Sequence, residues 1–306
     1  VTPNELVCTA AKHGTTTFIV DPHEAANVSG AAGIDYILNQ TEKSPANVYV
    51  MMPSCVPSTS VDDNGCVFSA NDMYPYVRNP RALGLGEVMD DPAVIHAEES
   101  MFVKMNLFEN RTIDGHAPYL PNKELSAYKM AGVDTDHEAT TFEYALEEVR
   151  RGLHVHIREG SAAHNLKDIV EGIVRTGIDT EYFSFCTDDK HIEDILRDGH
   201  IDYSVKMAVK LGLDPIRAIK MATINTAKCY GLKHLGAISP GFQADFVVLD
   251  NLTDLNVTDV FYKGKRLNED APIRVRPCSH VLKHTVHLDK VKAERFLLPI
   301  SKKKTH

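Results

Sequence analysis

Short apolar runs that end in acidic residues and histidines recur along the chain up to about residue 190. Each run has the length of a β-strand, and most neighbouring runs are separated by apolar residues at helical spacing, as in residues 142–151 and 166–175. Strands that alternate with helices at intervals of about 20–40 residues predict β/α units and a parallel sheet. The runs are residues 15–20, 48–52, 82–86, 112–114, 131–133, 154–157 and 182–186.

The polar residues after these runs favour a closed barrel over an open sheet. Barrel enzymes build their active sites from the carboxyl ends of all their strands, whereas an open sheet gathers its ligands at one switch point. The sequence also lacks the glycine-rich motifs that cradle nucleotide phosphates, G-x-G-x-x-G after the first run and G-x-x-x-x-G-K-[ST] anywhere. We therefore predict an α/β fold, a (β/α)8-type barrel with seven strands visible.

The first residues and the last third of the chain give the expected boundaries. Thr2, Pro3 and Glu5 predict a capping box, so the chain opens with a helix and we expect the first barrel strand to be missing upstream. Apolar runs at 245–249 and 257–262 predict a small β element outside the barrel. The predicted regions are a barrel over 1–232, the β element over 233–270, and over 271–306 a linker toward an absent C-terminal domain.

The composition is that of an ordinary globular protein and excludes several classes of partner. The chain has 306 residues, 43% of them hydrophobic, and a net charge of −9 without a basic run, which argues against nucleic-acid and membrane-surface partners. No apolar run approaches the roughly 20 residues that a membrane-spanning helix needs. The six cysteines are scattered and form no C-x-x-C pair, so we expect reduced thiols in a cytoplasmic protein.

Four polar residues that each follow a different run form the strongest candidate site. They are Glu87, His116, His137 and Asp188. In a parallel barrel these strand ends converge on one mouth. Carboxylate and imidazole groups are ligands for Zn²⁺, Mn²⁺ or Fe²⁺, and a cation would relieve the repulsion between gathered carboxylates. We predict that the four residues bind metal; the alternative is four ordinary polar loop residues.

Other polar residues at strand ends are weaker candidates. Arg158 and Glu159 are placed to touch a substrate, and an internal pair between them is the equal alternative. His23 follows the first run in a segment that is otherwise a turn with a helix cap. Asp188 and Asp189 fit a metal-bound base better than the helix cap that is their alternative.

Two histidines of the 154–157 run have the H-x-H spacing of a metal-binding pair. His154 and His156 point the same way from a strand because side chains alternate between its faces. They lie several residues before the strand end, however. We favour barrel packing or a place on the outer surface for both.

These motifs resemble those of the bacterial adenine deaminases, a family of the amidohydrolase superfamily. The resemblance runs from residue 1 to about 270, in order and with compatible spacing. It is carried by DPHEAANV (21–28), GLGEVMD (84–90), IDGHAP (113–118), TDHEAT (135–140), IREGSA (157–162), CTDD (186–189) and LGAISPGFQADFVVLDNL (235–252).

The resemblance implies a metal-dependent hydrolase barrel and assigns roles to matching positions. Glu87 corresponds to the strand-four acid that replaces the usual carbamylated lysine. His116 and His137 correspond to the strand-five and strand-six histidines, and Asp188 to the strand-eight aspartate. The resemblance also implies Mn²⁺ or Fe²⁺ and a homo-oligomer.

The implied reaction is the hydrolytic deamination of adenine to hypoxanthine and ammonia by a metal-activated water. Asp188 would accept the proton of the water and pass it to the ring or to the leaving amine. Glu159 is a second catalytic candidate, and Arg158, Asp189 and His23 are the substrate-binding candidates.

The sequence departs from the family at the strand-one H-x-H, which should immediately precede Val1. Three alternatives to an active adenine deaminase therefore stay open. One is a related amidohydrolase acting on another cyclic amidine or amide. The others are a catalytically inactive fragment and an open-sheet binding module without metal, which the acids and histidines at strand ends disfavour.

Overall fold

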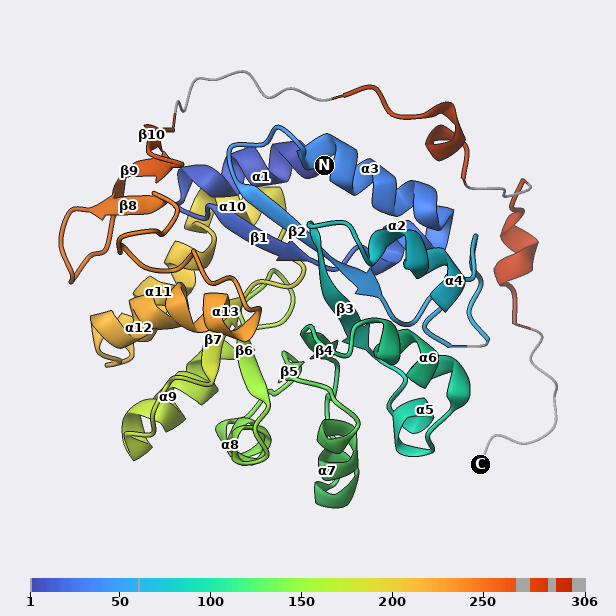
Figure 1. Cartoon of the computed structure of the whole chain (residues 1–306), viewed down its shortest axis with the longest axis horizontal. Coiled ribbons are helices and arrows are strands. Elements are labelled where there is room, and N and C mark those ends of the chain that lie inside the picture. Colours follow the sequence, from blue (N-terminus) through green and yellow to red (C-terminus); the bar gives the residue numbers. More distant parts are fainter. Residues whose placement is uncertain (1, 60, 268–275, 286–289, 299–306) are drawn as a thin grey trace.

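The first seven strands form a curled parallel sheet, with helices along its outer side (Figure 1). The computed structural model describes residues 2–59, 61–267, 276–285 and 290–298. One parallel ladder has the order β1-β2-β3-β4 and a second has the order β5-β6-β7. The strands are β1 (Thr17–Val20), β2 (Asn47–Pro53), β3 (Ala82–Val88), β4 (Ile113–Gly115), β5 (Thr135–Asp136), β6 (His154–Arg158) and β7 (Phe183–Cys186).

The predicted parallel β/α arrangement is confirmed, and the seven predicted strands form a curled sheet rather than a full barrel in the described residues. In these residues β1 pairs only with β2, and β7 only with β6, so each has an unpaired edge. No ladder joins β4 to β5 either. The strand β5 is only two residues long, and a backbone hydrogen bond from Asp134 N to Ile113 O, 2.8 Å long, crosses this break.

The predicted strand over residues 131–133 is wrong. Ala131 is instead the C-cap of helix α7 (Asn122–Met130), and Gly132 follows with a φ of +111°. Glycine adopts this left-handed backbone without a Cβ penalty and so ends the helix. The chain enters β5 only at Thr135.

Some of the helices begin at side chains that cap them. The predicted capping box of α1 is confirmed, because Thr2 Oγ1 accepts from Glu5 N at 3.3 Å and Thr2 N donates to Glu5 at 3.4 Å. Asp90, Thr141 and Asp214 cap α5, α8 and α12. The remaining bounds are α1 (Pro3–Lys12), α2 (His23–Ser29), α3 (Ala31–Thr41), α4 (Ala70–Met73), η1 (Tyr74–Tyr76), α5 (Asp91–Ile95), α6 (Glu99–Leu107), α8 (Phe142–Arg150), α9 (Leu166–Thr176), α10 (Ile192–Asp198), α11 (Ile201–Lys210), α12 (Pro215–Met221) and α13 (Ile224–Cys229).

The hydrophobic core divides where the sheet does. One cluster of buried side chains surrounds β2, β3 and β4 and includes Met52 and Leu85. A second surrounds β6 and β7 and includes Ile157 and Phe183. Full burial of one such side chain stabilises by about 1.5–3 kcal/mol. A third cluster contains Phe18 of β1 together with Ile195 of α10, so β1 also packs against the helix that follows β7.

The predicted small β element is an antiparallel sheet of order β10-β9-β8. Its strands are β8 (Phe246–Leu249), β9 (Val257–Tyr262) and β10 (Lys265–Arg266). Of the predicted linker, residues 271–275, 286–289 and 299–306 lie outside the described residues, as do residues 268–270. The described remainder contains η2 (His280–Lys283) and η3 (Ala293–Phe296), and the predicted region boundaries stay predictions. Among the described residues, no helix is long and apolar enough to cross a membrane.

Candidate metal centre

The carboxyl ends of the strands face a cavity of about 890 Å³. The cavity is lined along one side by β1 and along another by Phe185 and Cys186 of β7, so it occupies the space between the two unpaired sheet edges. The polar residues that line it near the strand ends include Asp21, His23, Glu87, His137, Asp188 and Asp189.

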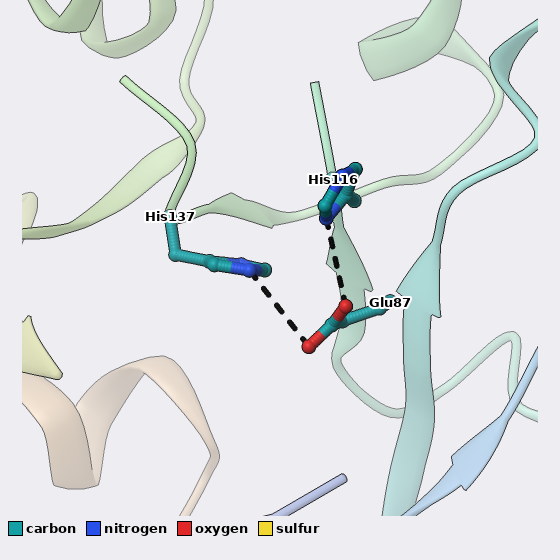
Figure 2. A group of neighbouring side chains, drawn as sticks. All are labelled: Glu87, His116 and His137. Carbon is teal, nitrogen blue, oxygen red and sulfur yellow. Dashed lines mark ion pairs between the residues drawn. The ribbon is translucent and has the colours of Figure 1, made fainter. Parts of the chain in front are cut away.

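Glu87, His116 and His137 come together at the mouth of the sheet (Figure 2). Glu87 is near the end of β3, and the two histidines lie directly after β4 and β5. His116 Nδ1 is 3.5 Å from Glu87 Oε2, and His137 Nε2 is 3.7 Å from Glu87 Oε1. Each imidazole therefore faces a different oxygen of one carboxylate, and one ligand atom from each residue fits within 4.8 Å of the others.

Asp188 lies in a second group that shares His137. The third member is Glu138, whose Oε1 is 3.4 Å from His137 Nε2, while Asp188 Oδ2 is 4.0 Å from the same nitrogen. Arg158 Nη1 donates to Asp188 Oδ2 at 2.7 Å and also to Glu138. The guanidinium thus holds the two carboxylates beside His137.

A third group consists of Asp21, His23 and Glu87. His23 Nδ1 is 3.3 Å from Asp21 Oδ1, and His23 Nε2 is 3.4 Å from Glu24 Oε1. A Cβ on Gly86 would lie 1.9 Å from Asp21 Oδ2, so glycine at this position is what lets the carboxylate lie against β3.

The imidazoles determine the charge of the central carboxylate. Burial acts to raise the pKa of Glu87, but the adjacent imidazole of His116 and the nearby His137 and His23 outweigh it and lower that pKa to about 2. Burial acts to lower the pKa of His23, yet Asp21 and Glu24 raise it to about 11. The pKa of Asp21 rises to about 6, mainly because of burial. Without a metal ion, the protonated imidazole of His23 balances part of the carboxylate charge.

The donor set fits a divalent cation. Among the described residues, Asp21 Oδ1 and Oδ2, His23 Nδ1 and His116 Nδ1 are buried without a hydrogen-bond partner. Buried polar atoms are ordinarily satisfied, and carboxylate oxygens with imidazole nitrogens are ligands of Mn²⁺, Fe²⁺ and Zn²⁺. A cation among these atoms would satisfy them.

The structure separates Glu159 from this centre. Its carboxylate accepts a hydrogen bond from His164 Nδ1 at 2.8 Å and lines a smaller cavity of about 130 Å³ with Lys190 and Asp194. The predicted catalytic role of Glu159 therefore has no support in the geometry. The alternative pair between Arg158 and Glu159 is also wrong, because Arg158 instead binds Glu138 and Asp188.

The helix-cap alternatives are wrong as well. The N-cap of α10 is His191 rather than Asp188 or Asp189, and α2 begins after Pro22 without a side-chain cap. His154 and His156 are buried and both contact Ser184 Oγ, as predicted for barrel packing.

Asp21 and Glu138 were not among the site residues predicted from the sequence. Glu138 directly follows His137, and strict alternation would have pointed it away from that histidine. Because β5 ends at Asp136, both residues lie in the following loop and face the same site. The short spacing from Asp21 to His23 was the available signal for Asp21.

Comparison with known proteins identifies the family of the chain. Residues 1–267 match the profile of the Amidohydrolase family. The chain belongs to the amidohydrolase family. It is 56% identical over 300 residues to an adenine deaminase of Desulfitobacterium hafniense, covering 98% of this chain and 53% of that protein. To an adenine deaminase of Kosmotoga olearia it is 45% identical over 276 residues, covering 89% and 48%.

Solved structures of other amidohydrolases and related hydrolases share the fold. A β-aspartyl dipeptidase of Fervidobacterium islandicum superposes with a TM-score of 0.61 at 14% identity, covering 88% of this chain and 78% of that chain. The crystal structure of an adenine deaminase gives 0.58 at 15% identity, covering 83% and 78%. This amidohydrolase chain spans about half the length of the curated relatives that it matches.

Proposed function

We propose that the chain is the metal-binding part of an adenine deaminase, which hydrolyses adenine to hypoxanthine and ammonia. The observation that carries the proposal is the convergence of Glu87, His116 and His137 at the sheet mouth. The 56% identity to an adenine deaminase supplies the choice of substrate.

Glu87, His116 and His137 would hold a divalent cation, which the resemblance suggests is Mn²⁺ or Fe²⁺ and which the donor set also allows to be Zn²⁺. A bound cation lowers the pKa of water and polarises the bond under attack. Asp188 would take a proton from the attacking water and return it to the leaving amine. Arg158 positions Asp188 for this task through the 2.7 Å hydrogen bond to Oδ2.

The substrate would occupy the cavity next to Asp188. His23 and Asp189 line this cavity and are the proposed contacts to the purine edge. The guanidinium of Arg158 is already bound to two carboxylates, so we propose it as a positioning residue. We further propose a cytoplasmic homo-oligomer, as the resemblance and the unpaired cysteines suggest.

Turnover would need a strand that the described residues do not contain. The resemblance places an H-x-H strand before β1, and the cavity between the edges of β1 and β7 is where such a strand would pair. A piece that binds metal but does not turn over adenine is therefore the second candidate function.

The test measures ammonia release from adenine, guanine, cytosine and a hydantoin by the Mn²⁺-loaded chain, with and without an added apolar H-x-H peptide. We expect adenine alone to react and the peptide to raise the rate. Asp188→Asn should lower kcat by about 10²–10⁴-fold. Reaction of another substrate, with none of adenine, would identify a related amidohydrolase and contradict the proposal.

A further inference from the structure

The two candidate histidine ligands lie on opposite sides of the break in the sheet. His116 follows β4, the last strand of one ladder, and His137 follows β5, the first strand of the other. A continuous ladder would fix the two strand ends relative to each other, and no ladder joins them in the described residues. Besides the backbone hydrogen bond from Asp134 N to Ile113 O, side-chain contacts therefore help to set the separation of these histidines.

The carboxylate of Asp136 bridges the break at the level of the ligands. Asp136 Oδ1 accepts a hydrogen bond from Ala117 N at 2.6 Å, directly after His116. Asp136 Oδ2 accepts from Glu138 N at 2.6 Å, directly after His137, and from Ala139 N at 3.1 Å. The side chain is fully buried, so one carboxylate holds both ligand-bearing loops without competition from water.

Glu148 is a buried residue of α8, and Asp136 is the acidic group that acts on it most strongly. One turn earlier on this helix, Tyr144 Oη donates to Ala117 O and accepts from Leu120 N, both at 2.9 Å. Glu148 is fully buried, and neither of its oxygens has a hydrogen-bond donor among the described residues. The neighbouring acidic group is the carboxyl group of Asp136, and two buried carboxyl groups with no other donor between them share a proton.

The chemistry of the pair assigns that proton to Glu148. Burial, and then the charge of Asp136, raise the pKa of Glu148 to about 11. Asp136 already accepts hydrogen bonds from three backbone N–H groups, so both of its oxygens act as acceptors.

We propose that Asp136 and Glu148 form a buried carboxyl pair that positions His116 and His137 for one shared metal ion. Glu148 donates a hydrogen bond to Asp136, and Asp136 holds the two loops across the break between β4 and β5. The metal part of this inference rests on the proposed function; the loop-holding part does not.

The first experiment measures the Kd for Mn²⁺ in the full chain and its variants. Glu148→Gln keeps a neutral hydrogen-bond donor and should keep Kd within about twofold. Glu148→Leu removes the hydrogen-bond donor at similar side-chain volume, and Asp136→Asn replaces one acceptor oxygen by an NH₂ group. Each variant should raise the Kd by about 10–100-fold, as is usual when a residue that orients a metal ligand is changed. Glu143→Gln, on the same helix with the Glu143 side chain 75% exposed, is the matched control. Unchanged Kd in both Glu148→Leu and Asp136→Asn would overturn the positioning role.

The second experiment measures amide hydrogen exchange without metal. In Glu148→Leu and Asp136→Asn the amides of Ala117 and Glu138 should exchange at least about tenfold faster. The reference is the Val155 amide in β6, which is bonded to Tyr182 O on the side of β7. Should the unsubstituted chain bind no Mn²⁺, the proposed function fails, and this exchange still decides the loop-holding role. Equal exchange at Ala117 and Glu138 in all variants would overturn it.

Discussion

At the scale of single residues, the candidate site depends on where carboxylates and imidazoles meet. The sequence predicted that Glu87, His116 and His137 converge, because each follows a parallel strand and such strand ends share one edge. It also proposed Glu159 as a catalytic residue, and in the structure the chain turns after β6 and pairs Glu159 with His164. The Asp136–Glu148 pair could not be predicted, because Glu148 lies on α8, whose residue spacing is that of an ordinary amphipathic helix.

Burial of His154 should make the free energy of unfolding depend on pH. Burial lowers the pKa of His154 to about 4, below the value of about 6.5 in an unfolded chain. The unfolded state therefore binds more protons between these values, and the free energy of unfolding falls as the pH falls, by up to about 1.4 kcal/mol per unit for this group. Urea unfolding between pH 7 and pH 4, roughly the range in which a buried histidine takes up its proton, measures the slope.

The variant His154→Gln should flatten this slope. Exchange of the exposed His96 for Gln is the control and should leave the slope unchanged. An equal acid slope in the His154→Gln variant and the unsubstituted chain would show that His154 does not contribute to the acid sensitivity.

At the scale of elements, the sequence located six of the seven sheet strands to within a few residues and misplaced the fifth. Apolar runs between polar clusters are strong signals for buried parallel strands. The fifth run failed because Ala131 and Val133 flank a glycine that ends α7, and the real strand is two polar residues. Whether the seven strands close could not be predicted, because closure depends on pairing between strands distant in sequence, which local patterns do not report.

Packing between α8 and α9 depends on one glycine. A Cβ on Gly172 would lie 2.0 Å from Phe142 Cγ, and both residues are buried. Gly172→Ala should therefore lower the free energy of unfolding by about 1–3 kcal/mol, the usual cost of overpacking, despite the better helix propensity of alanine. Urea denaturation measures the loss, and Val174→Ala, at a residue 38% exposed on the same helix, is the control. A stability gain in Gly172→Ala would refute this view of the interface.

At the scale of the whole molecule, the open side of the sheet is the feature with the largest consequence. The unpaired edges of β1 and β7 flank the cavity that contains the candidate site. Exposed edges pair with other chains unless something covers them. The unpaired edges should therefore affect both the association of one chain with another and access to the metal centre.

We expect the chain to associate at concentrations where a covered sheet would stay monomeric. An added apolar H-x-H peptide should reduce light scattering and raise the Tm, because it would cover both edges. A peptide of scrambled sequence is the control and should change neither quantity. A monomer with high Tm in the absence of any peptide would contradict the expectation.

The central claim is that Glu87, His116 and His137 form one metal centre, and Mn²⁺ binding tests it most directly. Equilibrium dialysis of the full chain, of Glu87→Gln and of the His96→Gln control gives stoichiometry and Kd under one condition. We predict tight Mn²⁺ binding by the chain and by the control, and loss of that binding in Glu87→Gln, because an amide supplies no charge to balance the cation. Equal Mn²⁺ binding by Glu87→Gln and the unsubstituted chain would contradict the account.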